Sequence, residues 1–138
     1  YMNLGFLHNE QGQFQEAIKN YNEAIEIDPN NFQLFYNRGI TFENLKQYEE
    51  SLKDYNHSIR LNNNFGMAFF NKSVLLFKLK KFDESLIAID QAIKINPHNW
   101  SSFIKKALIY LNATPSTLST NFSQLNGALA SSIFPINS

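Results

Sequence analysis

Apolar residues recur every three or four positions along most of the chain. One run places Phe14, Ile18, Tyr21 and Ile25 at this spacing, and a second run repeats it over residues 48–59. Such spacing puts the apolar side chains on one face of an α-helix and leaves polar side chains on the other. The pattern therefore predicts amphipathic helices, each of which must bury its apolar stripe against another element.

The same pattern returns at a fixed interval of 34 residues. The segments YNEAIEIDPNN (21–31), YNHSIRLNNNF (55–65) and IDQAIKINPHN (89–99) align without gaps. A constant period of this length indicates a repeat architecture, in which each unit buries its core against its neighbours. Further aromatic and small residues keep the register, namely Phe14, Tyr48 and Phe82, then Ala17, Ser51 and Ser85, and finally Ala24, Ser58 and Ala92.

Each unit is predicted to form a hairpin of two helices. The turn within the first unit lies at Gln11-Gly12-Gln13, and Pro29 and Pro97 end the second helix of their units, because proline cannot donate a helical hydrogen bond and disfavours helix at the residue before it. Small residues in the second helix allow two helices to approach to about 8–10 Å. The sequence thus predicts a solenoid of helical hairpins.

In these positions the chain resembles the tetratricopeptide repeat family. The consensus of that family has an aromatic residue, Leu-Gly and Tyr in the first helix, and Ala, an aromatic residue, Ala and Pro in the second. The resemblance covers residues 1 to about 111, with departures such as His8 and Asn63, and implies an all-α, right-handed α-solenoid of antiparallel helix hairpins with a 34-residue repeat. In the first unit the matching residues are Tyr1, Leu4, Gly5, Ala17, Tyr21, Ala24 and Pro29.

We divide the chain into hairpins at 1–31, 32–65 and 66–99, followed at 100–112 by the first helix of a fourth, capping repeat. The first hairpin starts inside its first helix, so we take the chain as a segment of a longer protein. Residues 113–138 carry no charge and are rich in Ser, Thr and Asn, which is typical of a flexible tail. Helical spacing nevertheless relates Leu118, Phe122, Leu125, Leu129 and Ile133, and with a two-residue insertion in the preceding turn we favour a degenerate second helix over a flexible tail.

Composition argues against several classes of function. The 12 basic and 12 acidic residues cancel, so no overall field attracts nucleic acid or an anionic membrane. The absence of cysteine excludes thiolate metal sites and a cysteine nucleophile, and fits a reducing compartment. No apolar run is long enough to span a membrane, and no nucleotide-binding or hydrolase motif occurs. We expect a cytoplasmic protein that is not an enzyme and needs no metal or other cofactor.

Asparagine recurs at one position of the predicted first helices. Asn3, Asn37 and Asn71 are 34 residues apart, with Lys105 in the fourth place. In a solenoid these side chains would form a row along the groove, and their amides could pair with the backbone of an extended peptide. The chain contains 19 asparagines, so chance is the alternative explanation. Apolar contacts are expected from Tyr36, Phe70, Phe77 and Met67, whereas we expect Ile40 and Val74 to pack in the core.

A carboxylate clamp, as used by chaperone-binding members of the family, is not expected. That clamp combines two lysines, two asparagines and an arginine, and the corresponding positions here hold Met2, Phe6, Asn37, Met67 and Asn71. Only Asn37 agrees with the clamp. Without the cations, the charge-assisted hydrogen bonds that hold acidic peptide ends are missing.

The sequence therefore predicts a protein-interaction module, a scaffold or adaptor, that binds a short peptide of a partner in its concave groove. Two alternatives remain open. The segment could be a regulatory or targeting region of a larger enzyme, or the uncharged tail could occlude the groove with Leu118, Phe122 and Leu125. RNA binding is disfavoured by the zero net charge.

Overall fold

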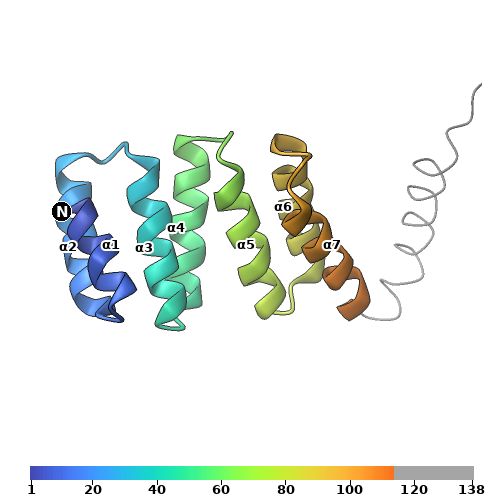
Figure 1. Ribbon diagram of the computed structural model, residues 1–138, viewed down its shortest axis with the longest axis horizontal. Helices are drawn as coiled ribbons and strands as arrows, with labels where there is room; N and C mark the ends of the chain where they lie inside the picture. The colour runs from blue at the N-terminus through green and yellow to red at the C-terminus, as the bar shows by residue number, and fades with distance from the viewer. Residues whose placement is uncertain (114–138) are drawn as a thin grey trace, which may run out of the picture.

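The computed structural model describes residues 1–113, and these residues form seven α-helices joined by short turns, with no strand among them (Figure 1). The sequence-based prediction of an all-α solenoid is confirmed. Residues 114–138, which include the possible second helix of the fourth unit, lie outside the described residues. The helices are α1 (Met2–Glu10), α2 (Phe14–Ile27), α3 (Phe32–Asn44), α4 (Tyr48–Leu61), α5 (Gly66–Lys78), α6 (Phe82–Ile95) and α7 (Trp100–Asn112).

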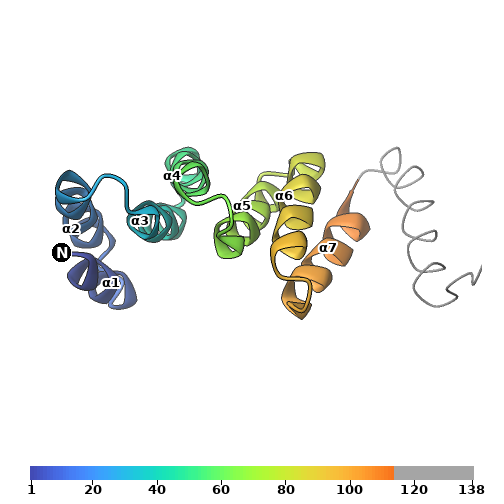
Figure 2. The same ribbon diagram turned by 90° about the horizontal axis from the view of Figure 1, so that it is seen from above.

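Consecutive helices pack side by side as hairpins, and the first helices of neighbouring hairpins approach one another. Figure 2 shows α1 and α3 along one side of the array and α2 and α4 along the other. In addition to the contacts between consecutive helices, α1 contacts α3 and α5 contacts α7. The helices α1, α3, α5 and α7 therefore line one side of the solenoid, which we call the first-helix face.

A glycine in the first helix makes room for a tyrosine of the second helix. A Cβ atom at Gly5 would lie 2.7 Å from the Tyr21 ring, and one at Gly39 would lie 2.8 Å from the Tyr55 ring. Both distances are too short for real carbon atoms, so the packing requires glycine at these positions. The third unit has a different pair of residues at this contact. Ser73 replaces the glycine, and the smaller Ile89 replaces the tyrosine, so a side chain fits in the first helix.

Each hairpin turns through one residue with a left-handed backbone. Gly12 has φ 73°, and the residues 34 and 68 positions later, Lys46 and Lys80, have φ 59° and 60°. Glycine adopts this conformation at no steric cost, whereas the lysines are strained by roughly 1–2 kcal/mol. The left-handed conformation is thus a property of the repeat, because it is kept whether the turn residue is glycine or lysine.

Two of the first helices, α3 and α7, begin with an asparagine cap. The side chain of Asn31 accepts a hydrogen bond from the backbone N–H of Gln33, and that of Asn99 accepts one from Ser101. Such caps stabilise a helix start by about 1 kcal/mol. Between them in the register lies Phe65, whose ring instead packs 4.9 Å from the rings of Phe32 and Tyr36.

Candidate functional site

Two depressions on the first-helix face contain the positions of the predicted asparagine row. The smaller, with a volume of about 330 Å³, runs across α1, α3 and the start of α5 and is called the N-terminal depression. The larger, of about 540 Å³, lies between the start of α5, the end of α6 and the start of α7 and is called the α5–α7 cleft. The N-terminal depression is lined by Met2, Asn3, Phe6, Gln33, Tyr36, Asn37, Phe65 and Met67.

The three asparagines of the predicted row occupy equivalent places on α1, α3 and α5. Asn3 and Asn37 both line the N-terminal depression, and Asn71 lines the α5–α7 cleft. Asn71 also donates a hydrogen bond from Nδ2 to the Tyr36 hydroxyl, at 3.0 Å. Within residues 1–113 the side-chain amides of Asn3 and Asn37 form no hydrogen bond, so both have unused donors and acceptors.

The predicted aromatic contacts differ in how far they are available to a ligand. Tyr36 is only 8% exposed and packs against Tyr55 and Phe65; only part of it lines the N-terminal depression. Burial raises the pKa of the Tyr36 hydroxyl, although the hydrogen bond from Asn71 opposes this shift. The hydroxyl therefore keeps its proton, which it can donate while its oxygen accepts from Asn71.

The remaining predicted residues are placed as follows. Met67 is 58% exposed and borders both depressions. Phe70 is half-buried and lines the α5–α7 cleft. Phe77 is also half-buried and lines neither depression, and the Lys105 ammonium lies 4.9 Å from the centre of its ring. Ile40 packs against the core around Tyr36, as the sequence predicted.

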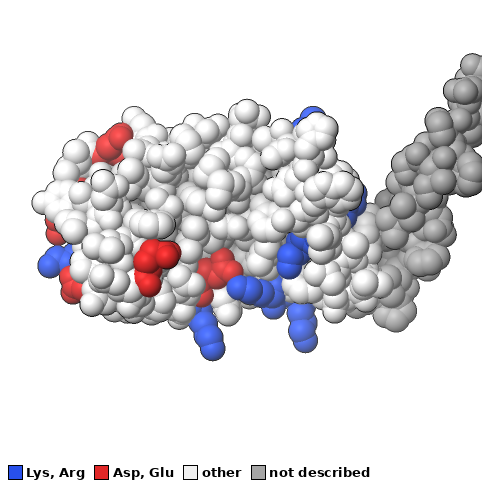
Figure 3. All heavy atoms as spheres, viewed as in Figure 1, with Lys and Arg blue, Asp and Glu red and all other residues white. Residues whose placement is uncertain are grey.

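Among residues 1–113, none of those that line the two depressions is charged. Figure 3 shows the first-helix face with charged side chains along its lower half and none in the centre of its upper half. The N-terminal halves of α3 and α5 lie in that upper half. A charged group of a ligand would lose its hydration there without gaining an opposite charge, which is unfavourable.

Two basic residues close to the asparagine positions, Arg38 and Lys106, are already engaged within the protein. Arg38 forms a bidentate ion pair with Asp54, with N···O distances of 2.7 and 2.8 Å, and donates a third hydrogen bond to Asn22. Lys106 pairs with Asp90 at 2.7 Å. Arg38 therefore ties α3 to both α2 and α4, and its guanidinium is not available to a ligand.

The five positions that correspond to a carboxylate clamp are brought together by the fold. Met2, Phe6, Asn37 and Met67 line the N-terminal depression, and Asn71 lies in the neighbouring cleft. Thioether, aromatic and amide groups thus occupy the positions at which a carboxylate clamp would need two lysines, two asparagines and an arginine. The surface can offer apolar contacts and neutral hydrogen bonds, but no ion pair.

Sequence reasoning missed the residues that precede each first helix. Phe65, Asn96 and Asn99 line the α5–α7 cleft from the turns before α5 and α7, whereas every predicted site residue lies within a first helix. The register would have revealed part of this set, because Asn31, Phe65 and Asn99 are 34 residues apart.

The described residues contain neither a metal-binding cluster nor a membrane-spanning helix. Residues 1–113 contain no group of three or more His, Asp or Glu side chains that could hold a metal ion. Among α1 to α7, no helix has both the length and the apolar character needed to cross a membrane.

Comparison with known families and structures gives consistent matches. A family model described as "TPR repeat" matches residues 5–46, and one described as "Tetratricopeptide repeat" matches residues 32–65 and 68–99. No curated protein matches the chain.

Among solved structures, the first TPR of Spaghetti (RPAP3) bound to the HSP90 peptide SRMEEVD is 25% identical, with a TM-score of 0.75 over 78% of this chain and 86% of that one. The second TPR domain of human RPAP3, in complex with the HSP70 peptide SGPTIEEVD, is 25% identical with a TM-score of 0.72 over 76% and 88%. The Arabidopsis OM64 TPR domain shares the fold at 17% identity, with a TM-score of 0.76 over 80% and 92%.

Proposed function

The chain belongs to the tetratricopeptide repeat family, and from this premise we propose that it is a protein-interaction module whose first-helix face binds a short, extended segment of a partner protein. In this proposal the chain acts as a scaffold or adaptor in the cytoplasm and has no catalytic role of its own. It does not act on nucleic acid or membranes. The peptide complexes of the RPAP3 repeats support a peptide ligand.

The observation that carries the proposal is the pair of unengaged amides in the N-terminal depression. Asn3 is exposed and Asn37 is half-buried, and each can donate to a peptide carbonyl and accept from a peptide N–H. The exposed Met67 and Phe6 add adaptable apolar surface beside them. Because backbone groups are common to all peptides, the asparagines would hold an extended segment, and the apolar residues would select its side chains.

The bound segment should be uncharged where it crosses the depressions. The SRMEEVD peptide of the RPAP3 complex carries three carboxylate side chains, and none of the residues lining the depressions could pair with them. We therefore propose that this chain does not bind acidic chaperone tails. Replacing Met2→Lys together with Met67→Lys should raise the affinity for SRMEEVD, since it supplies two ammonium groups at the clamp positions.

The proposal is tested by selecting peptides from a random display library and measuring their affinity for variants. Asn37→Ala should weaken binding about 2- to 13-fold, which corresponds to the loss of one hydrogen bond worth about 0.5–1.5 kcal/mol. Asn63→Ala is the matched control, because Asn63 is exposed in the turn before α5, away from both depressions. Equal affinities for Asn37→Ala, Asn71→Ala and the parent would reject the asparagine row.

The proposal also covers a chain that forms part of a larger protein, whose other regions would then carry any enzymatic activity. The alternative of a groove occluded by Leu118, Phe122 and Leu125 concerns residues outside the described part of the chain. Cleavage of the segment after Ala113 distinguishes it, because removal of an occluding tail should raise the affinity for the selected peptides.

A further inference from the structure

At the edge of the α5–α7 cleft the third unit lacks a side chain that its neighbours have. Gly66 begins α5, and the residues at the same register are Phe32 at the start of α3 and Trp100 at the start of α7. A Cβ atom at Gly66 would already lie 3.3 Å from Cγ2 of Ile95, so a larger side chain there would enter the space between α5 and α6. The cleft volume of about 540 Å³ falls within the range of ligand pockets, roughly 300–1,000 Å³.

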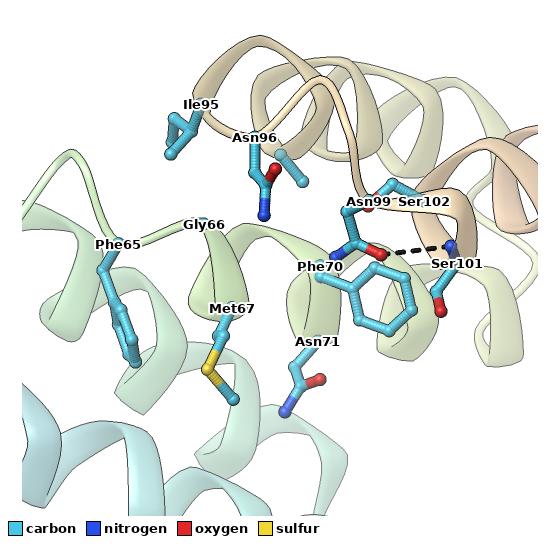
Figure 4. Close-up of a pocket in the computed structure, with 11 residues that line it drawn as sticks. Phe65, Gly66, Met67, Phe70, Asn71, Ile95, Asn96, Asn99, Ser101 and Ser102 are labelled. Carbon is cyan, nitrogen blue, oxygen red and sulfur yellow. Dashed lines mark hydrogen bonds between the residues drawn. The ribbon is translucent and has the colours of Figure 1, made fainter.

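The lining of the cleft combines an apolar surface with a rim of neutral polar groups. Figure 4 shows Phe70 and Asn96 extending into the space between α5 and the turn before α7. The apolar part also includes Phe65, Met67 and Ile95, and the rim includes Asn71 and Asn99. An aromatic or aliphatic side chain would lose water against this surface, whereas a charged group would find no counter-charge.

A buried hydroxyl in the lining has no partner. Ser102 is 1% exposed, and its Oγ forms no hydrogen bond within the described residues. The equivalent residues of the two preceding units are apolar, Leu34 and Ala68. Buried polar atoms are nearly always paired in folded proteins, and an unpaired one costs about as much as a lost hydrogen bond. A serine here, where the repeat otherwise places an apolar residue, is explained if a ligand supplies the missing partner.

We propose that the α5–α7 cleft is an anchor pocket for a tyrosine side chain of the bound peptide. The ring would lie against Phe70, Met67 and Ile95, and the phenol would exchange a hydrogen bond with Ser102 Oγ. Asn71 and Asn96 would be close enough to the entrance to hold the adjoining backbone. This inference rests on the proposed peptide-binding function and adds to it the identity of one ligand residue.

The test uses N-acetyltyrosinamide as the probe. Its binding is measured by two-dimensional amide NMR spectra of the isotope-labelled chain. We expect chemical-shift changes at millimolar probe concentration that are confined to the cleft, including Asn71, Asn96 and Ser101. N-acetylphenylalaninamide should bind more weakly. The corresponding glutamate probe, N-acetylglutamate α-amide, keeps a charged side chain and should cause no chemical-shift change in the cleft. Equal responses to the tyrosine and glutamate probes, or no response to tyrosine, would overturn the proposal.

Variants separate the two parts of the pocket. Ser102→Ala should weaken the tyrosine probe about 2- to 13-fold and leave the phenylalanine probe unchanged, without lowering the unfolding temperature, because it removes an unpaired buried group. Gly66→Phe should abolish binding of both probes. Gly66→Ala narrows the cleft with less disturbance and should weaken the binding of both probes. It takes the place of Gly66→Phe if the larger substitution prevents folding. Unchanged tyrosine binding in all three variants contradicts the assignment.

Ile87→Ala is the matched control, since Ile87 is 67% exposed and lines neither depression. The probe presents a single side chain and does not need Asn3 or Asn37. Probe binding without any library peptide binding would reject the proposed function alone, and the reverse result would reject the anchor pocket alone.

Discussion

Replacing Gly39 with alanine adds one methyl group at the tightest contact between α3 and α4. The new Cβ atom would lie 2.8 Å from Cε1 and 2.9 Å from Cδ1 of Tyr55, and 3.3 Å from Cβ of Asp54. Carbon atoms in contact normally stay about 3.5–4.0 Å apart. The overlap with the ring therefore has to be relieved by movement of Tyr55 or of the helices.

Tyr55 cannot move freely, because both ends of the side chain are held. It is fully buried, and its hydroxyl donates a 2.8 Å hydrogen bond to Glu43, which also pairs with Lys78. Overpacking of this kind costs about 1–3 kcal/mol, and alanine recovers about 1 kcal/mol of helix propensity over glycine. We therefore expect a net loss of up to about 2 kcal/mol in the free energy of unfolding for Gly39→Ala.

Urea denaturation followed by circular dichroism measures this loss, and a double-mutant cycle assigns it. Tyr55→Ile introduces the residue that the third unit has at the same position, Ile89, opposite Ser73. In that background Gly39→Ala should cost nothing or stabilise the chain, since the ring is gone. A Gly39→Ala variant more stable than the parent, or an equal change in stability in both backgrounds, would refute the packing argument.

Two further predictions concern the polar groups of the core. Asp54→Ala should lower the free energy of unfolding by roughly 2–3 kcal/mol, because it leaves the largely buried Arg38 without its bidentate partner. The control is replacement of the exposed Asp90 by alanine, which should cost less than about 1 kcal/mol. Equal losses for the two variants would contradict the account. Alkaline pH should also destabilise the chain, because burial raises the pKa of Tyr21 to about 12 and that of Tyr55 even more. Unfolded tyrosines ionise near pH 10, so between pH 10 and 12 the unfolded state releases protons first and the free energy of unfolding falls with pH. Urea midpoints measured from pH 8 to 11 with tyrosinate absorbance test this, and constant midpoints above pH 10 would disprove it.

The sequence was sufficient to predict the fold because the repeat supplies the evidence several times. Ala17, Ser51 and Ser85 are all fully buried, and the 34-residue register pointed to each of them. Gly5 and Gly39 were matched to the family consensus, but the reason for the glycines, the tyrosine ring of the partner helix, becomes visible only in three dimensions. The third unit has Ser73 and Ile89 where the first two units have glycine and tyrosine. This paired difference is understood only once the contact between the glycine and the tyrosine ring is known.

The candidate site was predicted less completely, because it depends on which side chains are already engaged. Spacing alone placed Tyr36 among the exposed contacts, yet its ring is buried and its hydroxyl is bound by Asn71. Arg38 stood beside the asparagine row in sequence, but it reaches across to Asp54 instead. At the edge of the α5–α7 cleft a side chain is absent at Gly66, which no hydrophobic pattern reveals.

The central claim is that the first-helix face binds uncharged peptide segments. A single amide NMR titration tests it most directly, with a library-selected peptide and SRMEEVD added to separate samples of the labelled chain. We predict that the selected peptide shifts the side-chain amide signals of Asn3, Asn37 and Asn71, and that SRMEEVD at the same concentration leaves them in place. Shifts confined to α2, α4 and α6, or an equal response to the acidic peptide, would contradict the account.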